Sequence, residues 1–167
     1  MHFMLQKAVV ERMAAGHGNK VYGRLSVMLQ AYCRVEPLFT VPPGAFTPAP
    51  KVDSAIVRLT PKTAAEIPSH DRARLQLLVR HGFSQRRKTL RNALDEVATI
   101  DQLQAAGIDP GARAEAIAVA DWLKLAATLN ARGLDGYIEV AGDAASAIYL
   151  NGRYVGQDVG AGASDGL

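Results

Sequence analysis

The sequence has little cysteine, few charged residues and no long hydrophobic run. One cysteine, Cys33, stands in 167 residues, so no disulfide can form within the chain. The longest apolar stretch, residues 116–120, is far shorter than the roughly 20 residues that cross a bilayer. The N-terminus has no basic segment followed by an apolar core and a small-residue cleavage site. These absences predict a small cytoplasmic protein that is not exported.

The four histidines do not form a metal-binding motif. They stand at positions 2, 17, 70 and 81, without the spacing or the neighbouring thiols and carboxylates of a metal site. We therefore predict no metal and assign these side chains to local structure.

Acidic residues are scarce in the first part of the chain. Residues 1–92 contain 15 Lys and Arg against 5 Asp and Glu, a balance of +10, whereas residues 93–167 contain 4 against 11, a balance of −7. A basic region attracts polyanions because neutralising phosphates releases counterions. The division predicts a nucleic-acid partner; the alternative is a basic surface that only keeps the protein soluble.

The order of elements in the first part predicts an α/β arrangement. Expected elements are a short buried strand at 2–6, a helix at 8–15, a helix at 23–34, and strands at 38–41 and 54–59. Gly16 is suited to a left-handed turn after the first helix. In the second helix the apolar spacing predicts a buried face that includes Leu25, and Cys33 is expected to be buried on it.

A polar connection then leads to four predicted helices, over about 71–80, 84–98, 101–106 and 110–129, the last with a break near Ala118. In the second of them, a helical period of 100° per residue makes one buried stripe of Phe83, Leu90, Leu94 and Val97. The same segment carries the cations Arg86, Arg87, Lys88 and Arg91. Their stems could pack on the domain while their heads reach phosphates, and Arg86 or Arg87 could instead form a structural ion pair.

A proline-rich loop presents one aromatic ring. Phe46 stands among Pro42, Pro43, Pro48 and Pro50, and Lys51 follows. Enzymes that modify a base take it out of the stack and hold it by aromatic contact. The rigid loop could present Phe46 to such a base; alternatively, Phe46 fills the gap between the sheet and the helices.

Several segments together resemble a known family. They are 46–54 (FTPAPKVDS), 83–92 (FSQRRKTLRN), 4–7 (MLQK), 22–27 (YGRLSV), 107–110 (GIDP) and 113–115 (RAE). In this order they resemble the small-subunit rRNA adenine N6,N6-dimethyltransferases, over residues 1 to about 129. The resemblance implies an α/β plus α fold: the C-terminal end of a Rossmann-like methyltransferase sheet (1–62), a helical RNA-binding domain (66–129) and a short glycine-rich β tail (133–167).

The resemblance also implies roles for individual residues. Phe46 would stack on the target adenine. The expected RNA contacts are Arg24, Lys51, Arg86, Arg87, Lys88 and Arg91. The partner would be rRNA in the assembling small ribosomal subunit, and the methyl donor of the intact family is S-adenosylmethionine.

The family's cofactor motifs are missing from this sequence. Its glycine-rich S-adenosylmethionine loop, acidic ribose-binding residue and Asn-Leu-Pro-Tyr motif would lie upstream of Met1. No other segment replaces them: residues 16–18 lack the third glycine of such a loop, and 160–162 are followed by Asp165 where the glycine should stand. We therefore expect a C-terminal portion that is inactive alone, with Met1 internal to a longer protein. The alternatives are a non-catalytic RNA- or ribosome-binding module and, third, a DNA-binding helical domain.

The tail contains 8 of the 15 glycines within residues 133–167. Short strands are expected at 137–141, 147–150 and 153–155, with a tight turn at 151–152. The segment resembles the opening of a PEGA-type β repeat; a hairpin on the helical domain or a flexible extension is equally compatible. We assign it no function.

Overall fold

The computed structural model describes residues 1–131, 138–141, 147–150 and 153–157. The chain forms two compact units, Met1–Leu129 and Asn130–Leu167.

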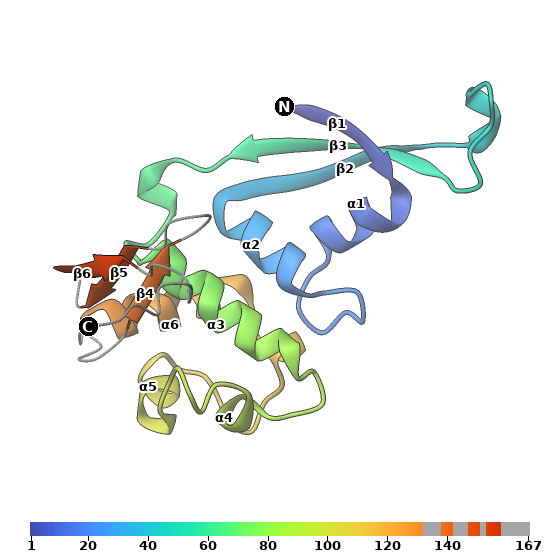
Figure 1. Ribbon diagram of the computed structural model, residues 1–167. Helices are drawn as coiled ribbons and strands as arrows, with labels where there is room; N and C mark the ends of the chain where they lie inside the picture. The colour runs from blue at the N-terminus through green and yellow to red at the C-terminus, as the bar shows by residue number, and fades with distance from the viewer. Residues whose placement is uncertain (132–137, 142–146, 151–152, 158–167) are drawn as a thin grey trace, which may run out of the picture. The chain divides into compact units, whose positions relative to one another are not determined.

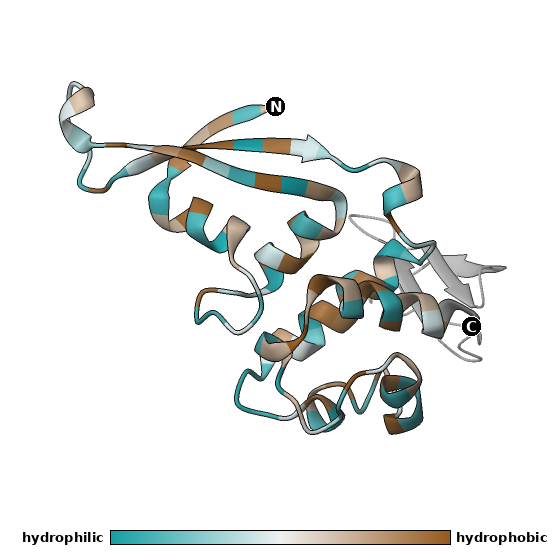
Figure 2. Cartoon of the chain, turned by 180° about the vertical axis from the view of Figure 1, so that it is seen from behind, coloured by the Kyte–Doolittle hydropathy of each residue, from teal (hydrophilic) through white to brown (hydrophobic). Residues whose placement is uncertain are grey.

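The first unit begins with a three-stranded antiparallel sheet (Figure 1). Its strands are β1 (His2–Gln6), β2 (Cys33–Val41) and β3 (Ser54–Pro61), in the order β1-β3-β2. The family resemblance implies that the last two strands of this sheet pair as a hairpin, and β2 and β3 pair in this way. Successive side chains of a strand point to opposite faces, and Figure 2 shows the matching alternation of hydropathy along the strands.

Two helices, α1 (Lys7–Ala14) and α2 (Arg24–Tyr32), pack on one face of this sheet. The covered face is a small hydrophobic core of its own. It consists of Val10, Met13, Ala55, Val57 and Leu59, all of them buried.

The prediction of a buried first strand is wrong in this structure. Strand β1 lies at the sheet edge and pairs with β3 alone, and Phe3 and Met4 are 42% and 52% exposed. An apolar sequence favours a central strand, but only a second neighbouring strand would cover its outer edge. No such strand is present among the described residues.

The helical part of the unit contains α3 (Arg72–Ser84), α4 (Leu90–Ala93), α5 (Ile100–Ala105) and α6 (Val119–Ala131), the last extending two residues past the unit's end, and the short 3-10 turn η3 (Ala114–Ala116). Two further 3-10 turns lie in connections: η1 (Pro43–Ala45) between β2 and β3, and η2 (Ala64–Glu66) between β3 and α3. Asp71 accepts hydrogen bonds from the backbone N–H groups of Ala73 and Arg74 and so caps α3. Of the helix predicted over 110–129, only the part from Val119 is helical: the segment before Ala118 contains the short turn η3 in place of a first helical half.

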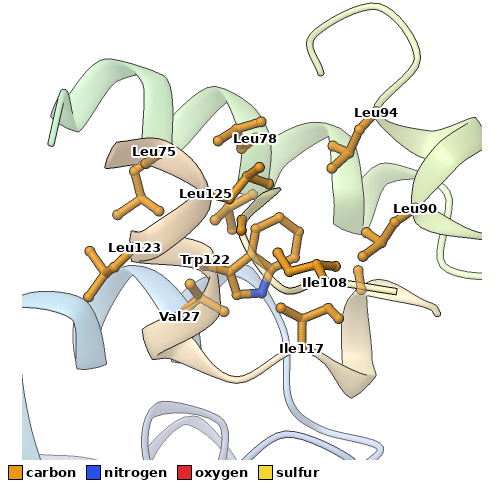
Figure 3. Packing of buried hydrophobic residues seen from close by; sticks show 14 of the residues in the cluster. Val27, Leu75, Leu78, Leu90, Leu94, Ile108, Ile117, Trp122, Leu123 and Leu125 are labelled. Carbon is orange, nitrogen blue, oxygen red and sulfur yellow. The ribbon is translucent and has the colours of Figure 1, made fainter. Parts of the chain in front are cut away.

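The larger core of the unit surrounds Trp122. This ring is fully buried, and Figure 3 shows Leu78, Ile108, Ile117 and Leu125 around it. The same cluster includes Tyr22, Val27 and Ala31, which come from α2 and the loop before it. Residues of the sheet-bearing part therefore contribute to the larger core, in addition to the small core under the sheet. The predicted domain boundary between residues 62 and 66 remains a prediction.

The predicted helix over 84–98 is wrong, although the burial of its apolar residues is right. Helix α3 ends at Ser84, Gln85 leaves the helical conformation, and α4 begins only after Thr89. Even so, Leu90 and Leu94 are fully buried, Val97 is 8% exposed and Phe83 packs against the same core. Apolar residues can meet one core from a turn as well as from a helix, so their spacing did not decide the backbone conformation.

Two boundaries also differ from expectation. Helix α2 ends at Tyr32, and Cys33 opens strand β2 with intermediate exposure, so it is not a buried helical residue. Leu25 is 45% exposed, and the buried face of α2 is formed by Ser26, Val27 and Ala31. After α1 the left-handed glycine is Gly18, with φ of 83°, whereas Gly16 does not adopt a positive φ.

The second unit contains strands β4 (Ile138–Ala141), β5 (Ala147–Leu150) and β6 (Arg153–Gln157). They form an antiparallel sheet in the order β4-β5-β6. The turn expected at 151–152 lies outside the described residues.

Candidate nucleic-acid interface

The connection between β2 and β3 carries Phe46. Its shape is set by local bonds: the N–H of Ala45 donates to the carbonyl of Pro42, and the N–H of Phe46 to the carbonyl of Pro43, both at 3.1 Å. The side chain of Phe46 is half-buried and belongs to neither hydrophobic core, and Lys51 is exposed. The connection can therefore present an aromatic ring and one cation without drawing on the packing of the core.

The turn between α3 and α4, residues 85–89, carries three of the predicted RNA contacts. Arg86, Arg87 and Lys88 all lie in this turn and are exposed, so their placement on a helix was wrong. Arg91 lies on α4 and Arg24 is the first residue of α2.

The structure brings this turn against the loop between α1 and α2. Arg86 Nη2 donates to the carbonyl oxygens of Lys20, at 3.1 Å, and Tyr22, at 3.0 Å, across more than sixty residues of sequence. It also lies 3.6 Å from Glu115 Oε2. Of the two residues for which a structural ion pair was considered, Arg86 forms it.

These contacts bring in a cation that the sequence reasoning missed. Lys20 is exposed in the α1–α2 loop, and only its backbone bond to Arg86 places it beside the turn. The excess of positive charge in residues 1–92 was the one sequence signal for it. We name the following set the basic cluster: Lys20, Arg24, Arg87, Lys88 and Arg91.

The basic cluster differs from two cations of the sheet-bearing part, Arg34 and Arg58. Arg34 pairs with Glu66, and Arg58 lies 3.8 Å from Glu36. Within residues 1–131, no side chain of the basic cluster has a hydrogen-bond or ion-pair partner. Exposed cations without carboxylate partners leave their charge available to phosphates.

Phe46 is not brought together with the basic cluster. Figures 1 and 2 show the β2–β3 connection projecting from one end of the sheet, away from the α3–α4 turn. A polyanion that contacts both has to extend along the unit between them.

Two titratable side chains with shifted pKa values, Tyr22 and Glu66, form hydrogen bonds that hold connecting segments of the unit in place. Burial raises the pKa of the Tyr22 phenol well above its ordinary value of 10.0, and its hydroxyl donates to the carbonyl of Ile117 at 2.7 Å. Hydrogen bonds from the backbone and side chain of Thr63, with a smaller contribution from Arg34, lower the pKa of Glu66 from 4.5. Tyr22 fixes the end of the α1–α2 loop, and Glu66 fixes the connection before α3.

The described part of the chain contains neither a glycine-turn cofactor motif nor a cluster of metal ligands. Strand β1 runs directly into α1 through Gln6 and Lys7, without a glycine turn that could cradle a phosphate or a nucleoside. Among these residues no three His, Cys, Asp or Glu side chains gather where a cation could bind. None of the helices described is long and apolar enough to cross a membrane.

Known sequences similar to this chain are rRNA methyltransferases. The family model described as "Ribosomal RNA adenine dimethylase" matches residues 1–131. The protein named ribosomal RNA small subunit methyltransferase A from Xanthomonas campestris pv. campestris (strain B100) is 65% identical over 126 residues, which are 75% of this chain and 48% of that protein. Its namesake from Xanthomonas oryzae pv. oryzae (strain PXO99A) is 64% identical with the same coverage. The chain spans about half the length of the curated relatives it matches.

Solved structures show the same similarity. A dimethyladenosine transferase from Plasmodium falciparum matches with a TM-score of 0.61 at 27% identity, over 74% of this chain and 55% of that one. The 23S rRNA methyltransferase ErmE matches with a TM-score of 0.56 at 25% identity, over 77% of this chain and 54% of that one. The architecture of these residues is thus that of part of an rRNA methyltransferase.

Proposed function

The chain belongs to the ribosomal RNA adenine dimethylase family, and from this we propose that it is the RNA-binding portion of an enzyme that dimethylates N6 of adenines in small-subunit rRNA. The observation that carries the proposal is the basic cluster, whose side chains have no acidic partner within residues 1–131. Its charge would follow the phosphate backbone of rRNA in the assembling small subunit. The protein would act in the cytoplasm, where the small subunit is assembled.

Phe46 would hold the target adenine. The ring is half-buried on a proline-stiffened loop and lies outside both cores, so it can accept a base on its exposed face without disturbing the fold. Stacking of a base on an aromatic side chain is worth about 1–3 kcal/mol. Lys51, exposed five residues later, would contact the backbone of the same nucleotide segment.

Methylation of an amine needs the N6 lone pair to be oriented toward the methyl donor, and no metal or covalent nucleophile is required. Methyltransferases of this family use S-adenosylmethionine as that donor. The described residues do not fit it, because no strand among them leads through a glycine turn into a helix. We therefore assign to this chain the binding and orientation of RNA, and no step of methyl transfer.

Binding as a function of salt tests the proposal. The full chain is titrated against a small-subunit rRNA fragment and against duplex DNA of equal length, at potassium chloride concentrations from 50 to 200 mM. We expect preferential binding of the rRNA fragment, with affinity that falls steeply as salt rises. The double charge reversal Arg87→Glu/Lys88→Glu should weaken binding at least tenfold, since it replaces two attractions with two repulsions. Unchanged affinity in that variant would contradict the placement of the interface.

A second candidate, an RNA- or ribosome-binding module without catalysis, is favoured by the missing glycine turn. Transfer of labelled methyl groups from S-adenosylmethionine to unmethylated small subunits by the chain alone separates the two. We expect no transfer from the chain alone. Stimulation of transfer when the upstream half of a relative is added as a separate polypeptide would support the enzyme portion; binding without stimulation would support the module.

A further inference from the structure

Arg86 differs from its neighbours in the turn. Its side chain is 48% exposed, and its guanidinium has three partners within the unit: the carbonyl oxygens of Lys20 and Tyr22 and the carboxylate of Glu115. Arg87 and Lys88, next in sequence, have none among the described residues. One of three adjacent cations therefore uses its hydrogen-bonding capacity inside the protein.

The three partners of Arg86 lie where the α1–α2 loop meets the segment 115–117. The N–H of Gly18 donates to the carbonyl of Glu115 at 2.7 Å, and the hydroxyl of Tyr22 donates to that of Ile117 at 2.7 Å. The α1–α2 loop is thus fixed at its start and end to the segment 115–117, while Arg86 fixes its middle to the α3–α4 turn (Figure 1).

The chemistry of the guanidinium suits this position. One guanidinium nitrogen of Arg86, Nη2, donates to both carbonyl oxygens and lies nearest the carboxylate, and the rigid planar group fixes the position of that nitrogen. The ammonium of lysine is a point charge on a flexible stem and does not reproduce this geometry. For an exposed contact with a phosphate, by contrast, lysine and arginine both supply the needed charge.

We infer that Arg86 is a positioning residue that fastens the α1–α2 loop to the α3–α4 turn, so that Lys20 joins Arg87 and Lys88 in one phosphate-binding face. The role in RNA binding rests on the proposed function. The fastening itself is a property of the protein alone and can be measured without RNA.

Limited proteolysis with trypsin tests the fastening. Cleavage after Lys20 requires the loop to leave the turn. In the full-length chain we expect slow cleavage at this bond in the wild type, and cleavage several-fold faster in both Arg86→Ala and Arg86→Lys. The matched control Arg87→Ala should be cleaved at the wild-type rate. Equal rates in the wild type and Arg86→Ala would overturn the inference.

RNA affinity tests the consequence. We expect Arg86→Lys to lose affinity as Arg86→Ala does, although lysine retains the positive charge. Adding Lys20→Ala should weaken binding several-fold in the wild type and in Arg87→Ala, but hardly at all in Arg86→Ala, because Lys20 is already displaced there.

The opposite pattern would assign Arg86 to direct phosphate contact. In that case Arg86→Lys binds like the wild type, and the effects of Arg86→Ala and Lys20→Ala multiply. The slope of log affinity against log salt would then become less steep by about 0.7 to 0.9 for each cation removed. If the wild-type chain shows no salt-dependent RNA affinity, the proposed function fails along with the RNA role of Arg86, while the proteolysis result still decides the fastening.

Discussion

The α3–α4 turn and the β2–β3 connection are both exposed and both carry predicted RNA contacts, but they are held in place differently. The turn is held by Arg86, whose bonds reach residues more than sixty positions earlier. The connection that carries Phe46 is shaped by prolines and by hydrogen bonds that span three residues. A segment held by distant partners depends on the fold of the whole unit, whereas a locally shaped one depends mainly on its own sequence.

The largest expected effect concerns the core that supports the turn. Trp122 is fully buried, lies 5.9 Å from Phe83 between ring centroids, and leaves no room for a Cβ on Gly82. Trp122→Ala should lower the free energy of unfolding by about 3–5 kcal/mol, measured by urea denaturation. Trp122→Phe should cost less, because it keeps an aromatic ring in the same core. A loss below about 1 kcal/mol for Trp122→Ala would contradict the importance of this core.

The next prediction concerns the locally shaped region. Phe46→Ala should change the free energy of unfolding by less than about 0.5 kcal/mol, because the ring belongs to neither core. Its affinity for an rRNA fragment with unpaired target adenines should fall by about 1–3 kcal/mol, measured by fluorescence anisotropy. Phe46→Tyr, which keeps the ring, serves as the control. A large loss of stability with unchanged RNA affinity would favour the alternative in which Phe46 fills a gap in the fold.

A third prediction concerns the junction at Tyr22. Burial raises its pKa, so folding favours the neutral phenol. The resulting stability is present below the ordinary pKa of 10.0 and is lost as the pH rises above it. Tyr22→Phe should cost about 1 kcal/mol at pH 7 through the lost bond to Ile117 and should remove part of the destabilisation between pH 9.5 and 11, measured by urea denaturation. Tyr32→Phe is the comparison variant, since the pKa of Tyr32 is raised less strongly by burial. An alkaline profile unchanged in Tyr22→Phe would contradict the argument.

The contrast between locally shaped segments and segments held by distant partners explains which features could be predicted from the sequence. The proline-rich connection follows from the local preferences of proline, and the strand at 54–59 from its β-branched residues; both were predicted correctly. The hairpin of β2 and β3 was implied by the family resemblance and is confirmed. The burial of Leu90 and Leu94 was also predicted correctly.

The conformation of the cationic segment was not predicted. A helical period was assigned to residues 84–98, but the core contacts of Leu90 and Leu94 are compatible with a turn at 85–89, and spacing alone does not distinguish the two. The placement of Lys20 beside Arg86 depends on a hydrogen bond between distant segments, which the excess of positive charge in the sequence does not indicate. Fold class and the aromatic loop were thus accessible from sequence, whereas the composition of the basic cluster required the structure.

The smallest expected effect lies in the connection between the sheet and α3, where a local and a distant contact meet on one carboxylate. Glu66 accepts hydrogen bonds from Thr63, three residues earlier, and pairs with Arg34 of β2. The bonds from Thr63 contribute most to lowering its pKa. A lowered carboxyl pKa adds stability that is present above the unfolded value of 4.5 and is lost as the pH falls through the folded value. Thermal unfolding between pH 3 and 6 should therefore show a slightly weaker acid dependence for Glu66→Gln than for the wild type. Because the carboxylate is exposed, Arg34→Ala should change this profile less than Thr63→Ala does; the reverse order would show that the distant ion pair, and not the local turn, holds this connection.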